Sequence, residues 1–360
     1  MGFSRAMEGK IYFKCSNPFG EHLEKISDTE NVKNDFSLSH MISLKKELQS
    51  IGYKITGARH DSNIILELHE NAFDKPDCAG VPLVGYAVET EHFWPNNYDR
   101  SILSRYKAFF HFDEEFLARN EWAIKTTEPR HLSSQYFDYE IMDWAERDFF
   151  IVCINRNKNY KTKCNYNGYE ERVKFMRSYL RDDKCQAIGS LALYGAGWDY
   201  PPKPAGFIDH YIFRTLQVFQ LRWISKLIYG RPIPAPVWRG PISTKSLVLS
   251  RSRFGLAIEN VYYRKGYVTE KIFDCIRSGC VPITKGDPIT SFKIPKSLYI
   301  NIDDFDSYDD LFAYMREYDS HTYTEWLNAR LHFIETADFR AGTAEYFAKN
   351  IVRKIASLLQ

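Results

Sequence analysis

The stretch over residues 253–288 concentrates the side chains of this sequence that could do chemistry. Its pattern predicts a helix over 270–278, with Thr269 as the N-cap residue. Lys271 then lies in the first helical turn, where a cation opposes the helix dipole. The arrangement becomes favourable when a phosphate binds there, because Lys271 and the free backbone N–H groups converge on the anion. A solvent-exposed Glu270–Lys271 pair is the alternative interpretation.

The order of residues in this stretch resembles the donor-binding signature of the α-1,3/4-fucosyltransferases. That signature reads Phe-x-x-x-x-Glu-Asn, a short loop, Tyr-Val/Ile-Thr-Glu-Lys, and then Gly-x-Val-Pro-x-x-x-Gly. The matching residues are Phe254, Glu259, Asn260, Tyr267, Val268, Thr269, Glu270, Lys271, Gly279, Val281, Pro282 and Gly286. Weaker similarity at Tyr194-Gly195 and Gly240-Pro241 extends the resemblance over about residues 85–305.

The resemblance implies an inverting glycosyltransferase that moves L-fucose from GDP-fucose to a glycan hydroxyl, in α-1,3 or α-1,4 linkage to a sugar of the N-acetylglucosamine type. Lys271 and the helix N-terminus would stabilise the departing GDP without an obligatory metal, and a divalent cation could stimulate the reaction. Tyr267 and Asn260 would contact the phosphates, and Glu270 a sugar hydroxyl. The expected donor-binding residues are Arg239, Lys245, Arg253, Glu259, Asn260, Tyr267, Thr269, Glu270 and Lys271.

Such a transfer also needs a base on the acceptor hydroxyl, and a carboxylate can supply it. Glu89-Thr90 followed by Pro95 is similar to the family element Glu-Ser-Pro-x-x-x-Pro, which implies that Glu89 is the base. Glu91 is the reserve, because side chains two residues apart on an extended chain point to the same side. A solvated acidic loop is the alternative. The acceptor-binding candidates are Glu91, His92, Trp94 and Tyr98, and the last three could instead pack in the core.

Two departures from the signature bear on the donor site. Many family members carry an Arg within the glycine turn where this chain has Ala196, and Arg239 could supply the missing charge. The loop before Tyr267 is also longer and contains Arg264 and Lys265. These two charges are either a solvated turn or a second pyrophosphate contact.

The elements that must position these residues alternate between strands and helices, which predicts βαβ units on parallel sheets. The expected strands cover 10–15, 63–68, 85–88, 108–112, 149–154, 191–194, 254–258 and 280–283. The expected helices cover 39–51, 169–180 and 270–278. The resemblance implies an α/β fold of the GT-B type, with two Rossmann-like domains whose parallel sheets face a central cleft.

A second βαβ pattern begins at Asp148, which sets the expected domain boundary. Residues 1–145 would form the acceptor-binding domain, residues 146–325 the donor-binding domain, and residues 326–360 a C-terminal helical segment. Residues 199–238, bounded by prolines, indicate an insertion with one helix. That helix is either packed or an interfacial, partner-binding helix with basic flanks.

Composition narrows the function classes. The net charge of +2, from 48 Lys+Arg against 46 Asp+Glu, argues against a nucleic-acid binder. No window approaches the ~18 apolar residues of a membrane span. The seven cysteines show no CxxC spacing, and Cys153 and Cys275 are expected in the core. We therefore expect a bacterial-type cytoplasmic enzyme. Peripheral contact with the inner face of a membrane is compatible with this sequence, and the oligomeric state is left open.

Two other functions stay open on the sequence. One is a GT-B glycosyltransferase that uses a different nucleotide sugar or an unusual acceptor, for which Ala196 and the insertion leave room. The other is a sugar-nucleotide-binding protein without catalysis, against which the intact Glu89, Glu270 and Lys271 count. The acidic run over 303–306 is expected at the surface.

Overall fold

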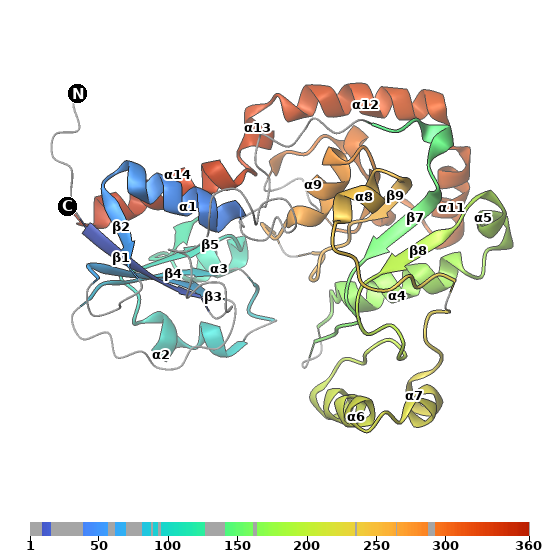
Figure 1. The fold of residues 1–360 in the computed structure, drawn as a ribbon, viewed down its shortest axis with the longest axis horizontal. Coiled ribbons are helices and arrows are strands. Elements are labelled where there is room, and N and C mark those ends of the chain that lie inside the picture. Colours follow the sequence, from blue (N-terminus) through green and yellow to red (C-terminus); the bar gives the residue numbers. More distant parts are fainter. Residues whose placement is uncertain are drawn as a thin grey trace. The chain divides into compact units, whose positions relative to one another are not determined.

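The computed structural model describes residues 9–15, 39–56, 62–69, 81–87, 89–92, 95–126, 141–160, 164–234, 236–263, 265–286 and 292–359. Contacts divide these residues into two compact units. The first unit holds the described residues of 9–126 together with 265–267 and 337–359, and the second holds those of 141–263 and 268–336. Each unit is built on one parallel sheet (Figure 1).

The sheet of the first unit has the strand order β2-β1-β3-β4-β5-β6, with every neighbouring pair parallel. Its strands are β1 (Gly9–Cys15), β2 (Tyr53–Thr56), β3 (Ile64–His69), β4 (Leu83–Ala87), β5 (Ala108–His111) and β6 (Ile124–Lys125). Its helices are α1 (Ser39–Ser50), α2 (Arg100–Leu103), α3 (Glu114–Arg119), α13 (Ala337–Arg340) and α14 (Ala344–Leu359).

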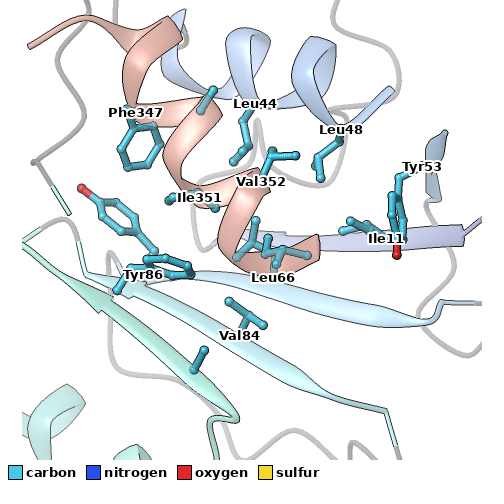
Figure 2. Close-up of a cluster of buried hydrophobic side chains, with 14 of the residues drawn as sticks. Ile11, Leu44, Leu48, Tyr53, Leu66, Val84, Tyr86, Phe347, Ile351 and Val352 are labelled. Carbon is cyan, nitrogen blue, oxygen red and sulfur yellow. The ribbon is translucent and has the colours of Figure 1, made fainter. Parts of the chain in front are cut away.

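The helices α1 and α14 lie side by side over one face of this sheet (Figure 1). Because side chains alternate across a strand, Val84 and Tyr86 of β4 share this face. Figure 2 shows Tyr86 lying toward Phe347 of α14, and Val84 belongs to the same cluster as Leu44 and Leu48 of α1. The rings of Tyr86 and Phe347 meet edge to face at 5.0 Å. The end of the chain therefore contributes to the core cluster on this face of the sheet.

This packing corrects the expected domain division. Residues 326–360 are not a separate segment, because α14 places Phe347, Ile351 and Ile355 in the core of the first unit. The described residues 141–145 belong to the second unit instead of the first. The reason is Trp144, which is buried against Phe254 at a ring distance of 5.3 Å.

The sheet of the second unit has the order β11-β10-β9-β7-β8, again parallel throughout. Its strands are β7 (Phe149–Ile154), β8 (Leu191–Tyr194), β9 (Ser252–Leu256), β10 (Val281–Thr284) and β11 (Ile300–Asn301). Its helices are α4 (Gly168–Tyr179), α5 (Asp183–Ile188), α6 (Phe207–Val218), α7 (Arg222–Tyr229), α8 (Lys245–Leu249), α9 (Glu270–Arg277), α11 (Tyr308–Glu317) and α12 (Ser320–Ile334). The predicted elements of this unit are present with ends shifted by at most two residues, and Cys153 and Cys275 are buried as expected.

The insertion differs from its prediction. The sequence predicts one helix, whereas the structure has two, α6 and α7, separated by a reversal in which Gln220 adopts a positive φ of 54°. Among the apolar residues of these two helices, Phe213 and Leu216 are buried, while Trp223 and Leu227 are exposed. No helix within the described ranges is both long and apolar enough to cross a membrane.

Candidate active site

In the first unit, Glu89 lies just beyond the carboxyl end of β4, and its carboxylate and backbone are both held. The hydroxyl of Tyr267 donates to Glu89 Oε2 at 3.0 Å. The hydroxyl of Tyr98 donates to the backbone carbonyl of Glu89. Nε2 of His111, at the end of the neighbouring strand β5, lies 3.0 Å from the Tyr98 hydroxyl. The carboxyl ends of two adjacent parallel strands thus bring these side chains together, as they do in other α/β sheets.

His111 is fully buried, and its bonds define its tautomer. The backbone N–H of Asp113 donates to His111 Nδ1 at 2.9 Å, so the neutral ring carries its proton on Nε2 and donates to Tyr98. Asp113 in turn caps α3 by accepting from the N–H groups of Glu115 and Phe116. A continuous chain of hydrogen bonds therefore runs from α3 to Glu89.

The short segment Lys265–Tyr267 belongs to the first unit, and a glycine makes its position there attainable. Gly266 has a φ of +86°, and a Cβ on it would lie 2.2 Å from the carbonyl oxygen of Phe112. The N–H of Glu114 donates to the carbonyl of Lys265 at 3.2 Å, and the ring of Tyr267 packs on Phe112 at 5.3 Å. These contacts direct the signature tyrosine onto Glu89.

In the second unit, Glu259 follows the carboxyl end of β9, and its carboxylate is the centre of a buried cluster. It accepts from the backbone N–H of Thr269 at 2.6 Å, from the Thr269 hydroxyl at 2.8 Å and from Lys271 Nζ at 3.1 Å. Lys271 Nζ also donates to the Thr269 hydroxyl at 2.8 Å. Thr269 is the N-cap residue as predicted, but its hydroxyl does not cap the helix, because it serves Glu259 and Lys271 instead. The Glu259 carboxylate compensates the cation that opposes the dipole of α9.

Glu270 is paired with Lys245 at the start of α8. Lys245 Nζ lies 3.2 Å from Glu270 and 3.3 Å from Asp274, one turn further along α9. Partial burial lowers the pKa of Lys245, but these two carboxylates raise it more, and the net shift is upward. Lys245 therefore stays charged and ties α8 to α9.

Asn260 is held by a residue that the sequence did not identify. The buried Arg172 of α4 donates to the carbonyl of Ile258 and, at 3.0 Å, to Asn260 Oδ1. The start of α4 approaches the same turn so closely that a Cβ on Gly168 would lie 1.7 Å from the carbonyl oxygen of Glu259. The signal for Arg172 was present in the sequence, because it occupies the apolar face of α4 together with buried aromatic residues.

Asp303 binds residues near the C-terminal end of the signature. It lies at the surface, as expected, and accepts from the Tyr263 hydroxyl at 2.8 Å, from Lys285 Nζ at 2.8 Å and from the N–H of Gly286 at 3.0 Å. Burial raises the pKa of Asp303, but these donors outweigh it, so the pKa falls below its ordinary value of 3.8. Burial and the Asp303 carboxylate raise the pKa of Tyr263 to about 12.

Two of the expected donor-binding cations pack on aromatic rings. Arg253, near the amino end of β9, donates to the Trp144 carbonyl at 3.1 Å and lies over its ring. It is therefore at the opposite end of this strand from Glu259, and the structure gives it a packing role. The backbone of Arg239 runs beside the glycine turn, since the N–H of Gly195 donates to the Gly240 carbonyl, but its guanidinium lies 4.7 Å from the ring centroid of Phe149.

The acceptor-binding candidates have different surroundings. Glu91 pairs with Arg119 at 3.0 Å, and Tyr98 is part of the network that holds Glu89. His92 is partly buried in the same turn, while Trp94 and Arg264 lie outside the described residues. Within the part of the chain that the structure describes, no three His, Cys, Asp or Glu side chains form a group that could hold a metal ion.

Comparison with known proteins finds a family match over part of the chain. Residues 224–351 match the family described as "Glycosyltransferase family 10 (fucosyltransferase) C-term". The chain is also 31% identical over 98 residues to "4-galactosyl-N-acetylglucosaminide 3-alpha-L-fucosyltransferase 9" of Mus musculus, which is 26% of this chain and 27% of that protein. The chain therefore aligns with only about a quarter of this relative. These matches confirm the resemblance drawn from the signature.

Solved structures are similar over the whole length. A crystal structure of α1,3-fucosyltransferase with GDP-fucose has a TM-score of 0.52 at 16% identity, covering 100% of this chain and 91% of that one. An α-glucosyltransferase in complex with UDP and a 13-mer DNA has a TM-score of 0.56 at 12% identity, covering 98% and 100%. At these identities the likeness concerns the fold, which is the expected GT-B type with two parallel α/β units.

Proposed function

We propose, on the premise that residues 224–351 carry the C-terminal domain of the family 10 fucosyltransferases, that this protein transfers L-fucose from GDP-fucose to a glycan hydroxyl. The observation that carries the proposal is the Glu259–Thr269–Lys271 cluster at the start of α9. It holds an ammonium group beside a helix N-terminus, which is an arrangement suited to a phosphate. The donor is proposed from the signature and from the similarity to a fucosyltransferase solved with GDP-fucose.

The donor half of the reaction is assigned to the second unit. As the bond between the fucose anomeric carbon and the β-phosphate oxygen breaks, negative charge develops on GDP. Lys271, oriented by Glu259 and Thr269, and the N–H groups of the first turn of α9 would stabilise that charge. Glu270 would accept from a sugar hydroxyl, and Asn260 would contact the phosphates. A divalent cation could add to this stabilisation without being required for it.

The acceptor half is assigned to the first unit, with Glu89 as general base. The acceptor hydroxyl gives its proton to the Glu89 carboxylate while its oxygen attacks the anomeric carbon. Attack occurs on the face opposite GDP, so the configuration inverts and GDP leaves with the bonding electrons. Tyr267 and the Tyr98–His111 pair act as positioning residues for Glu89. An α-1,3 or α-1,4 linkage to a sugar of the N-acetylglucosamine type follows the resemblance and the name of the mouse relative.

A second candidate is a GT-B glycosyltransferase with another nucleotide sugar. It is favoured by Ala196 in the glycine turn and by the α-glucosyltransferase with UDP, which has the same fold. Thermal-shift titrations with GDP-fucose, UDP-sugars and TDP-sugars separate the two. Our proposal expects stabilisation by GDP-fucose alone, whereas stabilisation only by another nucleotide sugar would reject the donor. Donor binding without transfer to any acceptor would instead indicate a binding protein.

A further inference from the structure

Large apolar side chains are exposed mainly in one place, the hairpin of α6 and α7. Nine of the sixteen exposed large hydrophobic residues in the described part of the chain lie within residues 207–228. Figure 1 shows α6 and α7 next to each other at the lower end of the second unit. A concentration of exposed apolar side chains in one element of a folded protein indicates an interaction surface.

On α6 the exposed apolar residues form one stripe. They are Phe207, Ile208, Tyr211, Ile212 and Val218, continued by Phe219, and both Phe207 and Ile208 are 72% exposed. At about 100° per residue, these positions fall within an arc of roughly 140°. The buried residues Phe213 and Leu216 lie outside that arc and face the protein.

Trp223 and Leu227 form a second, shorter stripe on α7. They are 68% and 79% exposed and lie one turn apart. Arg222 and Lys226, which precede them by one residue each, are also exposed and form a basic stripe beside the apolar one. Aromatic and aliphatic residues next to basic residues are the pattern of a helix that lies in a lipid interface.

The hairpin is a supported element of the second unit, because its inner side is anchored. The rings of Phe213 and Tyr229 pack at 5.4 Å and join α6 to α7. Arg222 pairs with Asp199 at 3.0 Å and lies over the ring of Tyr200. The exposed stripes are therefore presented by a fixed structure.

The charge around the hairpin indicates that its partner is anionic. Residues 199–231 contain five basic side chains and two acidic ones, of which Asp199 pairs with Arg222, while the whole chain has a net charge of only +2. A cavity of 420 Å³ at the base of the hairpin is lined by Tyr229 of α7 and by Lys158, Lys174, Arg177, Arg181 and Lys203, with the single carboxylate Glu170. A second copy of this basic surface would repel the first, whereas anionic headgroups would be attracted.

We propose that the α6–α7 hairpin docks this protein on a bilayer that contains anionic phospholipid. The exposed apolar stripes enter the boundary between headgroups and acyl chains, and the basic residues of the hairpin and of the cavity bind lipid phosphates. This attachment is peripheral and uses residues outside the proposed donor and base residues, so it can be tested independently of the proposed activity.

The test is sedimentation of the full chain with vesicles. Vesicles of phosphatidylglycerol and phosphatidylcholine in equal parts should bind the wild type, and vesicles of phosphatidylcholine alone should bind it much less. Trp223→Ser combined with Leu227→Ser should weaken binding at least tenfold, because both side chains lose their apolar burial. Arg214→Gln, at an exposed arginine of α6, combined with Lys226→Gln should weaken vesicle binding by roughly tenfold. This loss should be smaller at high salt, because salt already screens the attraction between the wild type and the vesicles.

Matched controls isolate the hairpin. The control for the apolar variant is Leu331→Ser, which removes an exposed leucine from α12. The control for the basic-residue variant is Arg353→Gln with Lys354→Gln, which removes two exposed charges from α14. Neither control should change vesicle binding. The basic-residue variant keeps the test decisive if the apolar variant folds poorly. Vesicle binding that is unchanged in both hairpin variants would overturn the proposal. A wild type that does not bind vesicles would also overturn it. If that wild type forms a dimer and Trp223→Ser makes it monomeric, the exposed face belongs to an interface with a second copy of the chain.

Discussion

Replacement of Glu259 by Gln tests the cluster on which the donor assignment depends. The Glu259 side chain is buried, and each of its two oxygens accepts from Thr269, with Lys271 Nζ as a third donor at 3.1 Å. An amide of the same size can still accept from the Thr269 N–H, and the Thr269 hydroxyl can rotate to accept from it. The contact that cannot survive is the ion pair, because the amide –NH₂ then faces the Lys271 ammonium.

The cost follows from that single loss. A hydrogen bond to a charged group contributes about 1.5–3 kcal/mol, so Glu259→Gln should lower the free energy of unfolding by about that amount. For a unit of this size the melting temperature should fall by roughly 3–12 °C. Glu259→Ala should cost more, about 3–5 kcal/mol, because it leaves Lys271 without its counter-charge at a side chain only 20% exposed.

A double-mutant cycle with Lys271→Met is the assay. Because the two side chains form one interaction, the double variant should be more stable than the sum of the single losses predicts, by at least about 1 kcal/mol. Thermal and urea unfolding near pH 7 measure all four proteins, and Lys296→Met, a substitution of an exposed lysine at another ion pair, is the control. Strictly additive losses, or a Glu259→Gln variant within about 0.5 kcal/mol of the wild type, would refute the pairing.

Three further predictions concern the proposed reaction and the pH dependence. Tyr267→Phe removes the bond to Glu89 and should lower kcat by about 10–150-fold, with unchanged affinity for GDP measured by calorimetry. Lys271→Ala should weaken GDP-fucose binding in the same assay by about 10–150-fold, because a charge-assisted contact to phosphate is lost. Asp303 has a lowered pKa, so its stabilising effect is present above its ordinary value of 3.8 and is lost as the pH falls below it. Asp303→Asn should therefore lower the melting temperature at pH 7 and flatten its decline below pH 5.

Each of these predictions would be contradicted by a specific result. A Tyr267→Phe variant with wild-type kcat would show that the tyrosine does not position Glu89. Equal GDP-fucose affinity in Lys271→Ala and the wild type would remove Lys271 from the donor site. A melting-temperature profile for Asp303→Asn that runs parallel to the wild type from pH 7 to pH 3 would show that the Asp303 contacts do not stabilise the fold.

Much of the fold could be predicted because its central strands are short apolar runs flanked by turns. The strands over 149–154 and 191–194 have the predicted ends, and α4 and α9 begin and end within a residue of prediction. The strands β2 and β6 were missed since they have four and two residues at the edges of their sheet, too short for an apolar pattern. The return of α14 to the first unit was missed because pairing across the length of a chain leaves no local signal.

The site could be predicted where a motif orders its residues, and less well where packing decides. The signature located Glu259, Thr269 and Lys271, but not that the Glu259 carboxylate would accept from the backbone N–H of the N-cap residue Thr269. His111 gave only a weak signal, a polar residue at the end of the apolar strand β5, and its role depends on the neighbouring strand. Arg253 was assigned from its charge and from the resemblance of the segment before the signature, whereas the structure places it near the amino end of β9, away from Glu259.

The most direct test of the central claim is transfer itself. Purified protein is incubated with GDP-fucose and a panel of galactose/N-acetylglucosamine glycans, and the products are analysed by mass spectrometry, with Glu89→Gln as the matched variant. Our account predicts a glycan that gains one fucose in α linkage, with transfer abolished in Glu89→Gln while that variant still binds GDP-fucose. Transfer of a different sugar from another nucleotide, or undiminished turnover by Glu89→Gln, would contradict it.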